Sequence, residues 1–295
     1  MIPLPGQSAA DGEAYNLVTQ SLASYYDAEA TRRDKGEIQG WKREERQRFL
    51  DALMVGRTAA DHPTVLELGS GPGRDAQYFS DEYCCSVTCL DFSHEMVNKA
   101  KQRGLSAVKT DFSAGLDAAS SNFDAVYAMN SLLHVPKRRL RPLIADMARV
   151  LKPDGIAYVG LYGGNDFEGH WQADPSGQAR FFSYHTDEAL QRLLVQDGHF
   201  EIMKFERIDT GGSRGGSTEH HFQSVILKRS APRRSAPCAN CHLDPEKVAR
   251  WHTESNALLQ RMDAMIEARV AARAQEAVVS NTFSDVMEGD VHSQP

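Results

Sequence analysis

The chain has 295 residues, 41% of them hydrophobic and 25% charged, which is the balance of a globular protein with room for a sizeable core. These fractions argue against wholesale disorder, a collagen-like repeat and a coiled-coil rod. The formal net charge of −7 creates no overall positive field that would attract nucleic acid or anionic lipid, so neither is an expected partner.

The sequence shows neither a membrane-spanning segment nor a disulfide framework. It has no run of about eighteen apolar residues, and its first residues lack the basic and apolar segments of a signal peptide. The expected location is therefore the cytoplasm, with no membrane partner. Its five cysteines are an odd number, which does not suit a set of disulfides in a chain of this size, so free thiols are expected.

Residues 1–60 are expected to form a tail and two helices ahead of the main fold. The first dozen residues carry proline, glycine and serine without apolar periodicity, so we expect a loose tail there. Helical spacing of apolar residues begins near Tyr15 and runs through Tyr26. A second helix is predicted from Glu37 to about Val55, with apolar residues on one face and charged residues on the other.

Residues 61–229 are expected to form one domain in which strands alternate with helices. Strands are predicted at residues 64–68, 86–90, 107–110, 123–129 and 155–162, and helices at residues 75–82, 93–103, 136–151 and 186–196. This alternation indicates a parallel, doubly wound sheet. Two more strands, at residues 200–208 and 221–228, are joined directly by a glycine-rich loop and must be antiparallel. The expected fold is α/β, with a seven-stranded, mostly parallel sheet whose last strand is reversed.

A proline and a glycine mark the junction between the helix at residues 136–151 and the next strand. Pro153 cannot continue the helix, because it lacks the backbone N–H. Gly155 is expected to supply the left-handed backbone that turns the chain into the strand.

The last 66 residues are expected to form an appendage rather than part of the sheet domain. Residues 230–243 have the composition of a linker, and residues 244–295 are predicted to hold a long helix and a disordered tail. The apolar stripe of this helix must pack on the main domain or on a second copy, so a homodimer through it is expected. Cys238, Cys241 and His242 match a haem-attachment pattern and half of a zinc site, but no other feature supports either, and no metal is predicted.

The strongest local signal is a strand that breaks into a glycine turn and then opens a helix. It reads Glu67-Leu-Gly69-Ser70-Gly71-Pro-Gly73. Glycines let the backbone turn sharply and approach a ligand, and the helix start that follows offers unpaired amides. The alternative is a tight connection that binds nothing. The residues at the ends of the neighbouring strands favour a nucleotide-like ligand.

Two acidic residues end the next two strands. Asp91 at the end of the second strand can accept both hydroxyls of a ribose, although it could also serve as a helix cap. Asp111 at the end of the third strand can accept from an adenine amino group, and Phe112 beside it can cover the ring. Three consecutive strand ends thus present groups that match adenosine.

With these residues, the sequence from about Ala14 to Lys228 resembles the class I, Rossmann-like S-adenosyl-L-methionine-dependent methyltransferases. The resemblance rests on the glycine turn with Glu67, on Asp91, on Asp111-Phe112, on Asn130-Ser-Leu-Leu-His134 and on Leu151-Lys-Pro-Asp-Gly155. It implies S-adenosylmethionine as the cofactor. The cofactor-binding residues it implies are Tyr26, Glu67, Gly69, Ser70, Gly71, Gly73, Asp91, Phe92, Met96, Asp111, Phe112 and Asn130. A nicotinamide-dependent dehydrogenase is the main rival, but its fingerprint spaces the last two glycines three apart, whereas here all three are two apart.

Methyl transfer from a sulfonium needs in-line placement and exclusion of water more than covalent help from the protein. Where the acceptor must lose a proton, His134 after the fourth strand is the candidate base, with a backbone-bonding structural role as the alternative. The insert after the fifth strand is the candidate acceptor lid, although its aromatic residues could simply staple it to the next helix. The substrate-binding candidates in it are His170, Trp171, Arg180, Tyr184 and His185.

The expected function is therefore transfer of a methyl group to an oxygen or nitrogen of a small-molecule acceptor by in-line displacement. A methyltransferase acting on protein or nucleic acid is one alternative. A cofactor-binding module without catalysis is the other.

Overall fold

The structure is a computed structural model that describes residues 9–172, 174, 176–210 and 220–230. The chain divides into two units, Met1–Pro237 and Cys238–Pro295, and the second lies outside the described residues. The predicted long helix, the tail, most of the linker and the Cys238/Cys241/His242 cluster therefore stay predictions, as does the loose character of residues 1–8. The predicted domain boundaries stay predictions too.

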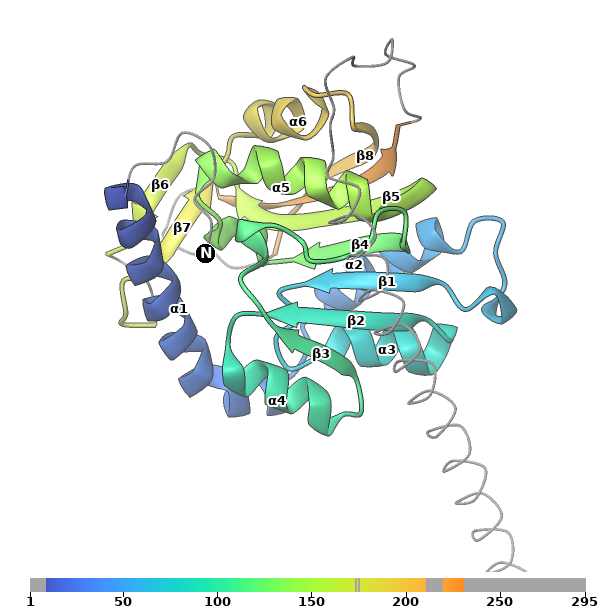
Figure 1. The fold of residues 1–295 in the computed structure, drawn as a ribbon, viewed down its shortest axis with the longest axis horizontal. Helices are drawn as coiled ribbons and strands as arrows, with labels where there is room; N and C mark the ends of the chain where they lie inside the picture. The colour runs from blue at the N-terminus through green and yellow to red at the C-terminus, as the bar shows by residue number, and fades with distance from the viewer. Residues whose placement is uncertain (1–8, 173, 175, 211–219, 231–295) are drawn as a thin grey trace, which may run out of the picture. The chain divides into compact units, whose positions relative to one another are not determined.

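A seven-stranded sheet with the order β3-β2-β1-β4-β5-β9-β8 forms the centre of the first unit (Figure 1). Its strands are β1 (Thr64–Leu68), β2 (Ser86–Asp91), β3 (Ser106–Lys109), β4 (Phe123–Met129), β5 (Leu151–Gly163), β8 (Phe200–Ile208) and β9 (His221–Arg229). The first five pair in parallel, and β9 pairs antiparallel with both β5 and β8. The predicted α/β sheet and its reversed last strand are confirmed.

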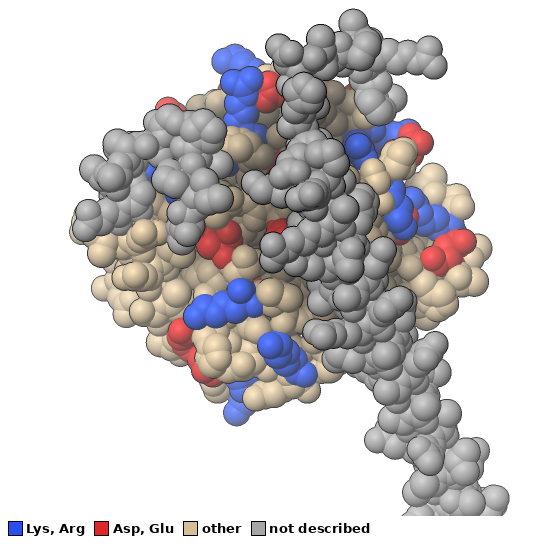
Figure 2. Space-filling model, in the orientation of Figure 1, with Lys and Arg blue, Asp and Glu red and all other residues tan. Residues whose placement is uncertain are grey.

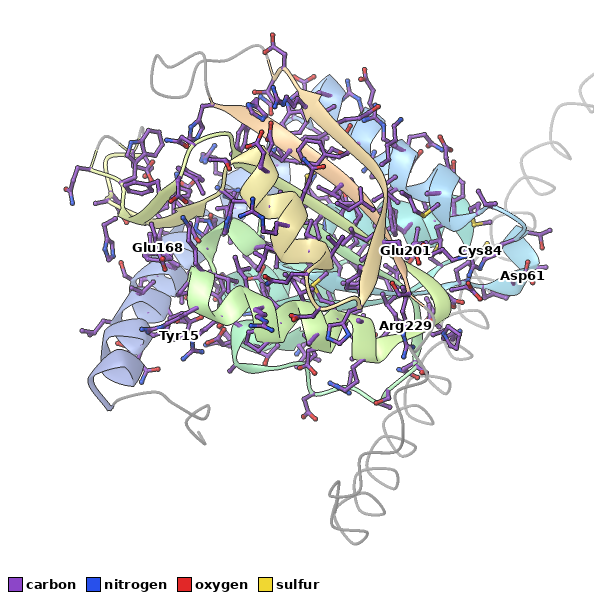
Figure 3. All side chains as sticks on the ribbon, turned by 90° about the horizontal axis from the view of Figure 1, so that it is seen from above. Tyr15, Asp61, Cys84, Glu168, Glu201 and Arg229 are labelled. Carbon is purple, nitrogen blue, oxygen red and sulfur yellow. The ribbon has the colours of Figure 1, made fainter. Side chains whose placement is uncertain are left out.

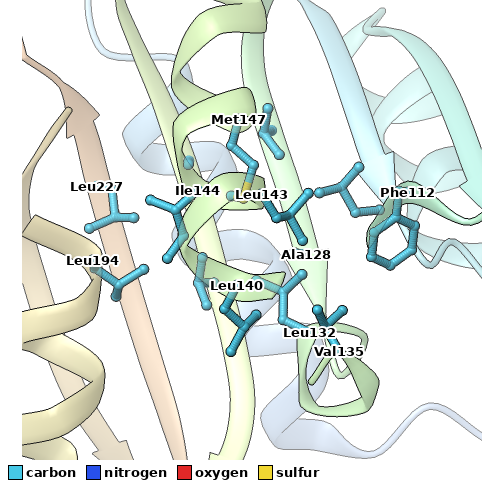
Figure 4. Close-up of a cluster of buried hydrophobic side chains, with 14 of the residues drawn as sticks. Phe112, Ala128, Leu132, Val135, Leu140, Leu143, Ile144, Met147, Leu194 and Leu227 are labelled. Atoms are coloured by element: carbon cyan, nitrogen blue, oxygen red, sulfur yellow. The ribbon is translucent and has the colours of Figure 1, made fainter. Parts of the chain in front are cut away.

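Helices cover both faces of this sheet, because each face of a parallel sheet is apolar and must be buried. The helices are α1 (Ala9–Lys35), α2 (Gly40–Leu53), α3 (Arg74–Tyr83), α4 (His94–Gln102), α5 (Lys137–Val150) and α6 (Asp187–Val195). One core contains apolar residues of α5 and α6 against β4, β5 and β9, as Figure 4 shows for Leu143, Ile144 and Leu194. The other core lies under α2, α3 and α4 and includes Phe49 and Phe79.

The helix α1 is longer than the sequence predicts. It begins at Ala9, inside the stretch expected to be a loose tail, and continues to Lys35, well past the predicted end near Tyr26. It runs along the edge of the sheet at which the parallel strands end (Figure 1). In Figure 3, Tyr15 of α1 lies at one end of the molecule, whereas Cys84, just before β2, lies at the opposite end. The helix α1 therefore borders the edge where ligands of such sheets bind.

One local prediction was wrong, and one insert has secondary structure that the sequence did not predict. The insert after β5, the candidate acceptor lid, contains an antiparallel pair, β6 (Phe167–His170) and β7 (Phe181–Tyr184). At the predicted helix–strand junction, which falls in the first residues of β5, Asp154 rather than Gly155 has the left-handed backbone, with φ at 60°. Gly155 is needed for space instead, because a Cβ there would lie 2.9 Å from the Lys152 carbonyl oxygen. The register with β4 shifts at this loop.

Three observations bear on membranes, thiols and metals. Among the described residues, no helix is both long and apolar enough to cross a membrane. Cys84, Cys85 and Cys89 are free thiols in this part of the chain. The same part holds no group of three or more His, Cys, Asp or Glu side chains arranged for a metal ion.

Candidate functional site

A cavity of about 410 Å³ lies at the carboxyl edge of the sheet, where the strand order reverses between β1 and β4. Its walls come from the glycine turn, the ends of β1, β2 and β4, the C-terminal half of α1 and the connection to α2. All of the predicted cofactor residues line it except Gly73 and Asp111. The strand ends that the sequence singles out therefore meet at one site.

The glycine turn owes its shape to positive φ angles of 72° at Gly69, 54° at Gly71 and 78° at Gly73. A Cβ on Gly69 would lie 2.3 Å from the Cβ of Ser131, so only glycine lets the turn approach the loop after β4. At Gly71 the nearest atom would be the Met96 Sδ, 3.9 Å away, so this glycine faces open space. Gly73 instead packs against the end of α4, which explains why it does not line the cavity.

Asp91 is held by two backbone amides. The Gly71 N–H donates to Oδ2 at 2.8 Å and the Ser93 N–H donates to Oδ1 at 2.9 Å. Burial raises the pKa of this carboxyl to about 6, although both amide bonds lower it. Each carboxylate oxygen keeps a lone pair for a further donor, such as a pair of vicinal hydroxyls. Asp91 is thus more than a helix cap, because the Ser93 side chain caps α4 through the Met96 N–H.

A pair of acids, Glu67 and Asp75, also lines this cavity. Burial raises the pKa of Glu67 well above its ordinary value, and the nearby Asp75 and Asp91 raise it further. Asp75 also has a raised pKa because of burial, which its contact with Arg46 at 3.3 Å partly offsets. A cationic ligand group would stabilise the ionised forms of both acids. The sequence analysis did not identify Asp75 as a site residue. The only feature that could have indicated it is its place as an acidic residue in the first helical turn after the glycines.

Asp111 does not face the cavity, contrary to what the resemblance implies. Its Oδ1 accepts from the Tyr15 hydroxyl at 3.1 Å, from the Ser113 N–H at 3.1 Å and from the Ser113 hydroxyl at 2.7 Å. These bonds make Asp111 a cap and an attachment point for α1. Its neighbour Phe112 lines the cavity together with Met96, and the two buried side chains could flank a planar base.

His134 is buried, and both of its ring nitrogens are occupied. Nδ1 lies 2.8 Å from the Phe181 carbonyl oxygen, which can only accept, so Nδ1 is protonated and donates. Nε2 therefore accepts from the Tyr26 hydroxyl at 2.6 Å. Burial lowers the pKa of His134 to about 3. This geometry matches the alternative of a histidine that bonds the backbone, and a role as general base stays a prediction.

Several polar groups on the cavity wall have no partner among the described residues. They are Nε of Arg33, Oδ1 of Asn130 and Oγ of Ser131, all buried. The guanidinium of Arg33 also lies 4.8 Å from the centre of the Tyr26 ring. Buried polar atoms are normally bonded, so these three are places where a ligand can bind. The sequence gives no sign of Arg33, because the path of α1 along the sheet edge is not encoded locally. Ser131 lies within the quoted motif Asn130-Ser-Leu-Leu-His134 but was not singled out there.

None of the predicted acceptor residues lines the cavity. Arg180 forms a buried ion pair with Asp174, Tyr184 stacks on Phe182 at 5.3 Å, and Trp171 contacts the same phenylalanine edge-on. Burial lowers the pKa of His185 to about 4, and His170 is exposed at the end of β6. These side chains build the β6–β7 hairpin and attach it to the domain, and their assignment to substrate binding stays a prediction that this cavity does not support.

The donor set fits an adenosine derivative with a positively charged side arm. Asp91 offers two acceptors for vicinal hydroxyls, and Met96 and Phe112 offer apolar faces for a base. The acids at positions 67 and 75 offer charge for an ammonium, and the unpaired Nε of Arg33 offers a donor for a carboxylate.

Comparison with known proteins agrees with this fit. Residues 65–155 match a family described as a methyltransferase domain. The chain is 30% identical over 158 residues to the phosphatidylethanolamine N-methyltransferase of Cereibacter sphaeroides, a match that covers 50% of this chain and 75% of that one. It is 31% identical over 112 residues to the malonyl-[acyl-carrier protein] O-methyltransferase of Enterobacter lignolyticus, covering 37% of this chain and 43% of that one.

A solved structure shares the fold. It is the 1,6-didemethyltoxoflavin N1-methyltransferase of Burkholderia thailandensis, which holds 1,6-didemethyltoxoflavin and S-adenosylhomocysteine. The identity is 20% and the TM-score is 0.55, over 78% of this chain and 94% of that one. The likeness extends across the seven-stranded sheet and its helices.

Proposed function

Because the chain belongs to the class I S-adenosylmethionine-dependent methyltransferases, we propose that it moves the methyl group of this cofactor to an oxygen or nitrogen of a small-molecule acceptor by in-line displacement. The cofactor supplies a methyl group already activated on a sulfonium. The observation that carries the proposal is that Glu67, the glycine turn, Asp91, Asn130 and Tyr26 line one cavity.

The proposed cofactor contacts follow from the unsatisfied capacity of these residues. Asp91 would accept both ribose hydroxyls while keeping its two backbone bonds. Glu67 and Asp75 would face the positive charge of the ammonium and sulfonium groups, and Arg33 would pair with the carboxylate. Met96 and Phe112 would enclose the adenine. Each contact uses a group with hydrogen-bonding or charge capacity that its protein partners leave over.

We propose that catalysis is by positioning. Tyr26 of α1 lines the cavity, and its hydroxyl bonds to His134, which also lines it. This bond joins two segments that are 108 residues apart in sequence, and in the proposed mechanism it helps to exclude water from the methyl-transfer site. The unpaired Oδ1 of Asn130 and hydroxyl of Ser131 would orient the acceptor. The lowered pKa of His134 makes it a weak base, and both of its ring nitrogens are engaged, which supports orientation rather than proton removal.

A small acceptor is favoured over nucleic acid by the charge of the chain. The net charge is −7, and Figure 2 shows Lys and Arg side chains in separate groups with acidic side chains among them. Strong binding to nucleic acid relies on clustered cations. The names of the two relatives refer to a lipid amine and to an acyl group on a carrier, so an acceptor held by a lipid or carrier is a variant of the proposal.

The test is a mass spectrometric screen of metabolite extracts incubated with the protein and trideuteromethyl-labelled cofactor. We expect label in one small molecule with wild type and with Asp197→Ala, which removes an exposed acid of an ion pair with Arg141. Asp91→Ala should give no labelled product. Label only in macromolecules would contradict the small-molecule proposal, and cofactor binding without transfer to any fraction would favour a non-catalytic module.

We also propose that the protein is cytoplasmic and that residues 244–279 join two copies. The support is the apolar stripe of that segment in the sequence. Light scattering of the purified chain should give the mass of a dimer, and a monomer mass at micromolar concentration would contradict it.

A further inference from the structure

Arg180 and Asp174 form a buried ion pair that the cavity does not use. Nε and Nη2 of Arg180 donate to the two carboxylate oxygens of Asp174 at 2.6 Å and 2.8 Å. The side chains are 8% and 0% exposed. Asp174 also accepts from the Ser176 N–H at 2.9 Å, so it organises the turn between β6 and β7. Neither residue of the pair lines the cavity.

The same guanidinium reaches α1. With Nε and Nη2 bound to Asp174, the remaining nitrogen Nη1 donates to the Tyr26 hydroxyl at 3.4 Å. The guanidinium lies 4.6 Å from the centre of the Tyr25 ring and 5.0 Å from that of Phe182. Arg180 therefore connects the hairpin turn, strand β7 and helix α1 through one planar group.

This contact complements the bond between Tyr26 and His134. The Tyr26 hydroxyl donates its one proton to Nε2 of His134, so its lone pairs remain for a donor. Arg180 is that donor, and it cannot act as the acceptor of the same proton. The arrangement leaves the Tyr26 hydroxyl one orientation, in which its proton faces His134 and its ring borders the cavity.

Stability alone does not explain the pair. Taking two charges out of water costs about as much as their attraction returns, so a buried ion pair adds little net free energy of folding. Its advantage over an apolar contact is directional, because the guanidinium is a rigid fork that holds its donors in one plane. The planar guanidinium therefore fixes the position of the Tyr26 hydroxyl relative to the hairpin.

We propose that Arg180 is a positioning residue that holds Tyr26 in its closed orientation over the cofactor, with Asp174 fixing the guanidinium. The proposal rests on the proposed function only in taking the cavity as the cofactor site. It assigns the hairpin a role in cofactor enclosure.

The test is a double-mutant cycle on the full chain with S-adenosylhomocysteine as the probe. Affinity by calorimetry and dissociation rate by stopped flow are measured for wild type, Arg180→Met, Tyr26→Phe and the double variant. We expect each single change to weaken binding about fivefold or more, mainly through faster dissociation. The double variant should bind no more weakly than the weaker single variant, because both changes remove the same closed state.

Additive effects in the cycle, or a lower melting temperature of Arg180→Met with unchanged affinity, would overturn the proposal. If Arg180→Met does not fold, Arg180→Lys takes its place, because it keeps the charge beside Asp174 and loses the fork that reaches Tyr26. Arg141→Met is the matched control, since Arg141 makes a bidentate pair with Asp197 outside the cavity, and it should bind as wild type does. Failure of the wild type to bind would contradict the cofactor assignment instead.

Discussion

Affinity for S-adenosylhomocysteine should fall as the pH is lowered through 6, because Asp91 must be ionised to accept two hydroxyls. The pKa of Asp91 is raised to about 6 by burial. The bound ligand favours the carboxylate, so protons compete with the ligand below this pKa and cease to compete above it. The affinity for S-adenosylhomocysteine should therefore be lower in acid and constant above neutral pH.

The size of the effect follows from the same value. At pH 5, about a tenth of the Asp91 side chains are ionised, so the dissociation constant should be about tenfold higher than at pH 7.5, equivalent to about 1.4 kcal/mol. Between pH 5 and 7 the carboxylate and ammonium of the ligand do not change charge. His134 does not contribute either, because burial lowers its pKa to about 3.

The assay is calorimetric titration from pH 5 to pH 8 in buffers of differing ionisation enthalpy, which also counts the protons released on binding. Near pH 6, wild type should release about half a proton per ligand from Asp91. Asp91→Asn should bind about thirtyfold more weakly at pH 7.5, since it loses charge-assisted bonds. A dissociation constant of wild type that stays flat between pH 5 and 8 would refute the reasoning. A pH dependence retained in Asp91→Asn would assign it to Glu67 or Asp75.

Three further outcomes are expected. The imidazole of His134 should show the Nδ1-protonated neutral form by ¹⁵N NMR down to about pH 5, because its pKa is lowered to about 3. Gly69→Ala should lower the free energy of unfolding by at least about 2 kcal/mol in chemical denaturation, since it combines a φ of 72° with a steric clash. Native protein should react with a thiol reagent at the exposed Cys84 and not at the buried Cys89, as mapped by mass spectrometry.

Each of these outcomes has a control. If the ¹⁵N NMR signals of the His134 imidazole titrated near pH 6.5, His134 would be free to act as a base. Gly56→Ala shares the φ of 72° but meets no atom within 4 Å, so it should cost only about 1 kcal/mol, and an equal cost at both glycines would contradict the clash. If Cys89 of the native protein reacted with the thiol reagent as fast as it does in denaturant, β2 would not be buried as it is in the structure.

Local patterns in the sequence were sufficient for the sheet. The strands at residues 64–68, 123–129 and 200–208 have the bounds that their apolar runs predict. The glycine turn, Glu67 and Asp91 were found because a ligand-binding turn places its requirements within a few consecutive residues. Asp154 and Gly155 show the limit of this approach, because the sequence pattern located the turn but not which residue would have the positive φ.

Side-chain partners far apart in sequence could not be predicted this way. Apolar spacing predicted only part of the 27-residue helix α1, and nothing in it indicated that Tyr15 would engage Asp111 or that Tyr26 would engage His134. Arg180 has the chemistry of an anion-binding residue, and only the folded hairpin shows that Asp174 already occupies it.

The sequence by itself determined the α/β sheet, the glycine turn and the carboxylate for the ribose, because backbone geometry and strand order follow from short-range patterns. Only the tertiary structure decided what each polar side chain does. The role of a polar side chain depends on which residue from a distant segment contacts it in the fold and on how far the side chain is buried from water. Burial and a second hydrogen-bond partner thus made His134 a neutral anchor, although its position in the sequence suited a base.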